Sequence, residues 1–104
     1  MDEDHRIFER FSARFPLRFL DLKENREGIA QVRDVSAKGV GMITNEELQP
    51  HTPVEMWLQI PDHGEPLYTR GEVVWSKVRG THYHAGVNLE RADMMGLSRV
   101  LRAV

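Results

Sequence analysis

Four arginines follow one another at four-residue intervals near the start of the chain: Arg6, Arg10, Arg14 and Arg18. A guanidinium group presents fixed N–H donors in a planar fork, and it forms charge-assisted, paired hydrogen bonds to phosphate or carboxylate oxygens. This series therefore makes an anion site one candidate function for the segment.

The same segment also fits an amphipathic helix from about Glu3 to Phe15. In such a helix Phe8, Phe11 and Phe15 recur at three- and four-residue steps on one face, and Pro16 would end the helix. The phenylalanines would then cover the rest of the domain, and the arginines would be solvated or would form exposed ion pairs of little energetic value. Both interpretations are open from the residues alone.

A second polar motif, Asp34-Val-Ser36-Ala-Lys-Gly39, separates two apolar runs. Asp and Ser side chains stabilise turns through local hydrogen bonds, and Gly supplies a positive φ where a turn needs one. Taken alone, the motif predicts a turn. It gains weight because it occurs in the same short chain as the arginine series.

Other residues that can do chemistry are less organised. His82 and His84 share one face of a predicted strand, as two metal ligands would, but no third ligand is apparent and we expect no metal site. Trp57 and Trp75 could stack on bases, but strand alternation favours the core for Trp75, and we expect each tryptophan in the core or at its rim. The stretch from Asp62 to Glu65 is polar and has no nucleophile beside it, so it is interpreted as a turn.

The elements that must position these residues are mostly strands. From Leu17 onward, short apolar or alternating runs are broken by Gly, Pro, Asn and Asp, as in antiparallel strands joined by short loops. The pattern predicts a six-stranded antiparallel β-barrel, with strands at Leu17–Leu22, Gly28–Val35, Val40–Thr44, Val54–Ile60, Leu67–Lys77 and Thr81–Leu89.

A short C-terminal helix is expected after the last strand. Asp93 is a suitable N-cap, and Met94, Leu97, Leu101 and Val104 then form one apolar stripe at three- and four-residue steps. This helix would pack on the barrel or on another subunit.

Length, charge and cysteine content limit the function classes. A chain of 104 residues with 40% hydrophobic content fits a single domain. No cysteine is present, which excludes disulfides and thiolate chemistry. With 14 Lys and Arg against 16 Asp and Glu, the net charge of −2 lacks the basic excess of a nucleic-acid-binding domain. No run of apolar residues is long enough to span a membrane, so we expect a cytoplasmic protein without membrane insertion.

The pair of motifs resembles the signature of the PilZ domain family. Arg10-Phe-Ser-Ala-Arg14 matches Arg-x-x-x-Arg, and Asp34-Val-Ser36-Ala-Lys-Gly39 matches Asp/Asn-x-Ser-x-x-Gly. Further similarity extends over nearly the whole chain, in Gly39-Val-Gly-Met-Ile-Thr44, Gly71-Glu-Val-Val-Trp75 and Tyr83-His-Ala-Gly86-Val. The resemblance implies a six-stranded antiparallel barrel with a flanking helix, a receptor for cyclic di-GMP, and no enzymatic activity or cofactor.

The resemblance also assigns ligand-binding roles. Arg10 and Arg14 would meet the O6 and N7 acceptors of guanine or hold phosphate. Asp34 would accept from the guanine N1 and N2 groups, Ser36 would add a polar contact, and Gly39 would let the ligand approach the backbone.

Two features of the arginine motif depart from the family pattern or complicate it. The residue before the first arginine is Glu9, which leaves one or two ligands per chain open, and Arg14 with Arg18 gives an alternative register. We prefer Arg10 with Arg14, because Arg18 lies in the first predicted strand.

The resulting prediction divides the domain into residues 1–16, an arginine-bearing switch segment, and residues 17–104, the barrel with its C-terminal helix. Ligand binding would close the segment over the site, and the signal would pass to a partner protein of unknown identity or through self-association into a homodimer. The alternatives are a PilZ-like adaptor that binds only protein and an unrelated barrel that binds single-stranded nucleic acid, the latter disfavoured by the missing basic groove.

Overall fold

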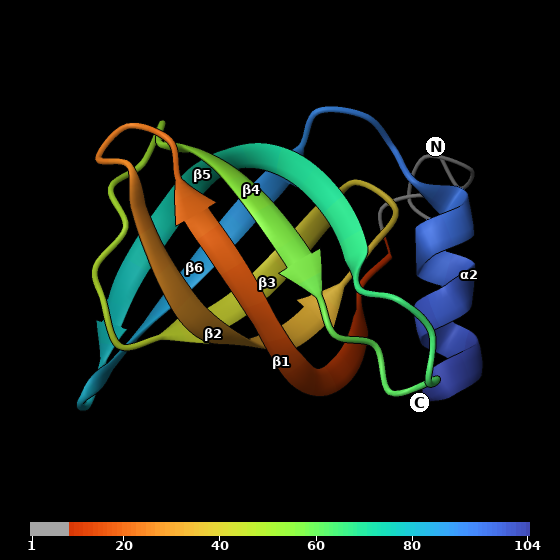
Figure 1. Cartoon of the computed structure of the whole chain (residues 1–104). Helices are drawn as coiled ribbons and strands as arrows, with labels where there is room; N and C mark the ends of the chain where they lie inside the picture. The colour runs from red at the N-terminus through yellow and green to blue at the C-terminus, as the bar shows by residue number, and fades with distance from the viewer. Residues whose placement is uncertain (1–8) are drawn as a thin grey trace.

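Six antiparallel strands close into a barrel in the order β1-β2-β3-β6-β5-β4, and the helix α2 packs at an end of it (Figure 1). This is a computed structural model, and it describes residues 9–104. The elements are β1 (Phe11–Asp21), β2 (Arg26–Val35), β3 (Gly39–Thr44), β4 (Pro53–Leu58), β5 (Leu67–Arg79), β6 (His82–Leu89) and α2 (Met94–Ala103). The predicted fold class is confirmed.

The first strand begins at Phe11, earlier than the predicted Leu17. Alternate residues of β1 are buried from Ala13 through Phe15 to Phe19, as expected for a strand with one face in the core. The predicted helix is therefore wrong over residues 11–15, and residues 3–8 lie outside the described part of the chain. Phe11 and Phe15 are four residues apart, which is an even number, so a pair that suggests a helix face also shares one face of a strand.

Pro16 does not end β1, because it lies where a missing backbone N–H removes few of the hydrogen bonds between strands. It faces outward, one residue before the pairing of β1 with β4 starts at Leu17. Its carbonyl accepts a hydrogen bond from the Gln59 amide at 2.9 Å. Proline is tolerated at such a position because it lacks only the N–H. Residues 11–16, which the predicted division assigned to the N-terminal segment, thus belong to a barrel strand.

The core fills the inside of the barrel with aliphatic, Met and Phe side chains. The largest side chains with less than 2% exposure are Phe19, Leu17, Met42, Leu48, Met56, Ile60, Val32, Val54, Val73, Val87 and Val100. They come from all six strands, the segments around β4 and the helix, so the strands that carry the candidate site have one common packing layer behind them.

Helix α2 begins as predicted, but it presents a different face to the barrel. Asp93 is its N-cap and accepts from the Gly96 amide at 2.8 Å. The buried residues are Gly96, Leu97 and Val100, whereas Met94 is 57% exposed. The predicted stripe is therefore wrong apart from Leu97. Gly96 sets the contact face, because a Cβ there would lie 2.9 Å from a methyl carbon of Leu67.

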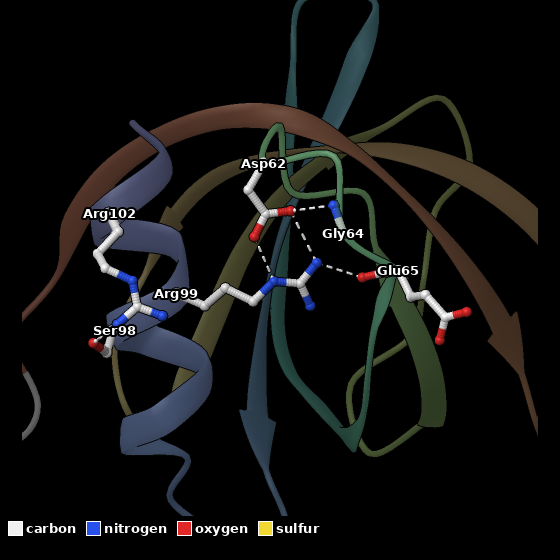
Figure 2. A network of polar contacts seen from close by, with 6 residues as sticks. All are labelled: Asp62, Gly64, Glu65, Ser98, Arg99 and Arg102. Atoms are coloured by element: carbon white, nitrogen blue, oxygen red, sulfur yellow. Dashed lines mark hydrogen bonds and ion pairs between the residues drawn. The ribbon is translucent and has the colours of Figure 1, made fainter.

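An ion pair ties α2 to the loop between β4 and β5 (Figure 2). Arg99 donates from Nε to Asp62 Oδ2 at 2.6 Å and from Nη2 to Asp62 Oδ1 at 3.0 Å, and it also donates to the Glu65 carbonyl. The Gly64 amide donates to Asp62 Oδ1 at 2.9 Å. The segment predicted as a turn is a bent loop whose first carboxylate anchors the helix.

Replacing Asp62 by Asn is expected to destabilise the protein at neutral pH but not in acid. Hydrogen bonds from Arg99, then from the Gly64 amide, hold the pKa of Asp62 well below its usual value of 3.8. Because the folded-state pKa is depressed, this stabilisation is present above pH 3.8 and is lost as the pH falls toward the lower folded-state value. Urea midpoints of both proteins measured from neutral to acid pH should converge. Curves that stay parallel would contradict the role of the ion pair.

Candidate functional site

Four of the five predicted ligand residues meet where β2 turns into β3. Arg10 precedes β1, Asp34 lies near the end of β2, Ser36 is in the turn, and Gly39 begins β3. Arg10 Nη1 lies 3.4 Å from Asp34 Oδ1, and Arg10 Nη2 would lie 3.3 Å from a Cβ built on Gly39. The open groove beside them is lined by Arg10, Ser36, Lys38, Gly39, Val74, Val87 and Asn88.

Arg14 occupies the outward face of β1 and is exposed. It lies inside a β-bulge between Ser12 and Phe15, and Ser12 is the strand partner of Asp34. Arg14 and Arg18 both lie in β1, so position in the strand does not decide which of them belongs to the arginine motif. The contacts of the two side chains distinguish them.

Arg18 is engaged away from the Asp34 groove. Its guanidinium forms an ion pair with Glu27 at 3.1 Å and lies 4.4 Å from the centre of the Trp57 ring. This geometry favours the register of Arg10 with Arg14 over that of Arg14 with Arg18.

The Asp34 carboxylate is held by two guanidinium groups and still has an unused acceptor. Arg33 Nε donates to Oδ2 at 2.9 Å, while Arg10 lies 3.4 Å from Oδ1. Oδ1 is buried and has no hydrogen-bond partner among the described residues. A buried polar atom without a partner costs free energy, and a ligand with N–H donors would remove that cost.

The turn that carries Ser36 is fixed by backbone hydrogen bonds. The Ser36 amide donates to the Gly39 carbonyl at 2.9 Å, and Ser36 Oγ accepts from the Lys38 amide at 3.3 Å. The Asp93 amide donates to the Ala37 carbonyl at 2.7 Å. The turn therefore links the candidate site directly to the N-cap of α2.

Two glycines form a flat floor on the outer face of the barrel beside Asp34. Gly41 pairs with Asp34 on one side and with Gly86 on the other, and Gly86 pairs with Trp75. A Cβ on Gly41 would lie 2.6 Å from Asp34 Oδ1, and a Cβ on Gly86 would overlap the Trp75 indole. Asp34 and Trp75 thus lie over the two glycines at opposite sides of this floor.

Trp75 does not lie in the core, which the alternation of its strand favours, and it is only partly buried. A β-bulge between Val73 and Trp75 shifts the register against β6, so that Trp75 pairs with Gly86 on the outer face. Ser76 takes the inward position opposite Ala85, and its Oγ is buried without a hydrogen-bond partner in residues 9–104. One extra residue exchanges the two faces of a strand, and the bulge therefore brings an indole to the candidate site.

Two cationic side chains lie close to the Trp75 indole. Arg33 Cζ lies 5.8 Å and Lys77 Nζ 5.9 Å from the ring centre. Arg33 Nη1 also lies 3.0 Å from His84 Nδ1, which must accept because a guanidinium only donates. Burial, then the charges of Arg33 and Arg79, with a smaller effect of Arg14, lower the pKa of His84 below 6.5. At neutral pH the site therefore combines a neutral imidazole with positive guanidinium groups.

His82 and His84 do not form part of a metal cluster in the described chain. No group of three or more His, Cys, Asp or Glu side chains suited to a metal occurs within residues 9–104.

Within residues 9–104, no helix has the length and apolar character needed to cross a bilayer.

Arg33, His84 and the outward position of Trp75 were not predicted from the sequence as parts of this site. Gly41 and Gly86 carried the one usable signal, since glycines inside strands often mark close approach by another group. The bulges that place Arg33 and Trp75 leave no trace in the apolar pattern.

Comparison with known proteins agrees with this architecture. The PilZ domain family model matches residues 4–104. The inhibitor of motility MotI/DgrA of Bacillus subtilis superposes with a TM-score of 0.71 at 12% identity, over 93% of this chain and 48% of that protein. The PilZ domain of YcgR from Escherichia coli, solved with c-di-GMP, gives a TM-score of 0.70 at 12% identity, over 94% and 90% of the two chains.

A third similar structure is the PlzA protein of Borreliella burgdorferi in complex with c-di-GMP. Its TM-score is 0.60 at 9% identity, over 97% of this chain and 36% of that protein. Among curated proteins, none matches the sequence. The family match over nearly the full length, together with the barrel and its paired arginine and Asp-x-Ser-x-x-Gly motifs, shows that this chain belongs to the PilZ domain family.

Proposed function

We propose that this domain is a receptor for cyclic di-GMP and that it leaves the nucleotide chemically unchanged. The observation that carries the proposal is the Asp34 carboxylate, which is held between Arg10 and Arg33 and has a buried oxygen that accepts no hydrogen bond from the described residues. The solved PilZ domain of YcgR with c-di-GMP supports the choice of ligand.

The chemistry of guanine fits this arrangement. Its N1 and N2 groups are donors that Asp34 Oδ1 can accept, and its O6 and N7 atoms are acceptors that suit the fork of Arg10 or Arg14. Charge-assisted hydrogen bonds from the same arginines would hold the phosphates. A side chain at position 39 would crowd the groove, because its Cβ would lie 3.1 Å from the Val87 carbonyl oxygen and 3.3 Å from Arg10. Gly39 therefore leaves this space open for the ligand. Ser36 would add a hydroxyl contact at the turn.

Trp75 supplies an aromatic surface for a base. Since base stacking on an aromatic side chain contributes about 1 to 3 kcal/mol, Trp75→Ala should weaken cyclic di-GMP binding about five- to hundredfold. The chain has two tryptophans, so a Trp57→Phe variant leaves Trp75 as the single indole reporter. Its emission should change in a saturable way with cyclic di-GMP but not with GTP. Equal responses to both nucleotides, or none, would contradict the proposal.

The conformational step belongs to the segment before Phe11. We propose that Arg10 and the residues preceding it close over the bound nucleotide, while Arg14 acts from its fixed place on β1. The ligand can shift this equilibrium only by its difference in affinity for the open and closed states. Because the Ser36 turn bonds to the N-cap of α2, a partner protein could sense the nucleotide through either the N-terminal segment or the helix.

A further inference from the structure

The β5–β6 hairpin has an open strand edge that begins next to the candidate site. β5 pairs with β4 only as far as Glu72. At Val73 the contact is extended by two backbone hydrogen bonds, in which the Val73 amide donates to the Thr52 carbonyl and the Val73 carbonyl accepts from the His51 amide. From Val74 to Arg79 no other strand within residues 9–104 pairs with this edge. The two strands continue past their neighbours at the end of the barrel away from α2 (Figure 1). An edge of this kind offers backbone N–H and C=O groups to another chain.

The side chains along this edge are apolar and basic. Val74 is 48% and Val78 67% exposed. Lys77 and Arg79 flank Val78, and neither forms an ion pair with any residue in the described range. His82, which pairs with Arg79 across the hairpin, adds no negative charge. The open edge therefore combines two exposed valines with a local positive charge in a protein whose net charge is −2.

These features select one kind of occupant. Pairing with the same edge of a second copy would bring Lys77 and Arg79 close to their own equivalents, and like charges across a strand pair are destabilising. The bulge at Val74 also protects the edge against such self-pairing. An extended segment with acidic side chains would gain the backbone hydrogen bonds and opposite charges together.

We propose that the Val74–Arg79 edge of β5 binds an extended acidic segment of a partner protein by strand addition. The proposal rests on the proposed function in that this partner would receive the nucleotide signal. Trp75 connects the two sites, since its indole lies over Gly86 on the floor of the candidate site while its backbone belongs to the open edge. Occupation of the indole face is therefore expected to change the affinity of the edge for the segment.

The test uses a fluorescent peptide of alternating glutamate and valine, about eight residues long, as the acidic strand. We expect saturable binding, slower hydrogen exchange of amides within residues 74–79, and no binding of the matching lysine–valine peptide. A Val78→Asp, Arg79→Glu double variant should reduce the affinity at least about tenfold, whereas the matched charge reversal Arg102→Glu on α2 should leave it unchanged. A melting curve for each variant checks that the barrel is folded.

Absence of saturable binding up to about 1 mM peptide, or binding that leaves exchange within residues 74–79 unchanged, would overturn the proposal. Stronger binding of a single-stranded oligonucleotide or of anionic lipid vesicles through the same residues would also overturn it, in favour of those partners. A separate titration with cyclic di-GMP keeps the two ideas distinct. If the domain does not bind cyclic di-GMP in that titration, the proposed function is refuted. The peptide experiment still shows whether the Val74–Arg79 edge binds an acidic strand.

Discussion

Replacing both Arg10 and Arg14 by alanine is expected to weaken cyclic di-GMP binding by about thirtyfold or more. Each bidentate arginine contact to guanine contributes about 1 to 3 kcal/mol, so the loss of two corresponds to about 2 to 6 kcal/mol. Arg10 adjoins the Asp34 carboxylate at 3.4 Å, and Arg14 lies on the outward face of β1. Calorimetric titration of the double variant and of each single variant measures the effect.

Arg18→Ala is the matched control for this experiment. Arg18 has the same spacing in the sequence, but it pairs with Glu27 and stacks over Trp57. Its removal should change the affinity less than about twofold, as expected for a group outside the site. An equal loss on replacing Arg18 would instead support the register of Arg14 with Arg18, and unchanged affinity in the double variant would contradict the arginine roles.

Phe19→Ala is expected to reduce the free energy of unfolding by about 3 to 5 kcal/mol. Phe19 is fully buried at 0% exposure, and its neighbours on β2 and β4 are Gly28 and Met56. Removal of the ring would leave a cavity behind the second half of β1, because the closed barrel can collapse only partly around it. For a domain of this size the melting temperature should fall by more than about 10 °C.

Phe11→Ala provides the comparison for the core prediction. Phe11 begins the same strand but is only partly buried, so its truncation should cost less. Thermal melts of both variants, followed by circular dichroism, separate the two costs. A loss for Phe19→Ala no larger than that for Phe11→Ala would contradict the assignment of Phe19 to the fully buried core.

Most of the fold could be predicted because the strands alternate in polarity and glycines, prolines and polar loops separate them. The start of β1 could not, since a four-residue spacing of phenylalanines satisfies both a helix face and a strand face. The contact face of α2 was missed for a related reason. Gly96 carries no apolar side chain, yet it is the residue that allows α2 to approach Leu67.

The candidate site was predictable only where family motifs mark it. Asp34, Ser36 and Gly39 are adjacent because a short turn joins β2 and β3, and such a local arrangement is readable in sequence. Arg33 and Trp75 are different, because each follows from a bulge. The register shifts between Val32 and Asp34 and between Val73 and Trp75 depend on pairing with distant strands. Local patterning does not encode that pairing.

The most direct test of the central claim is calorimetric titration of the purified domain with cyclic di-GMP, with GTP as the control ligand. We expect saturable heat for cyclic di-GMP alone, with a dissociation constant in the micromolar range, equivalent to about 8 kcal/mol. The stoichiometry then shows whether one or two ligands bind per chain. If no heat of binding is detected at about 100 μM cyclic di-GMP, the domain is not a receptor for this nucleotide. The domain would then be assigned to the PilZ-like adaptors that act through protein contacts alone.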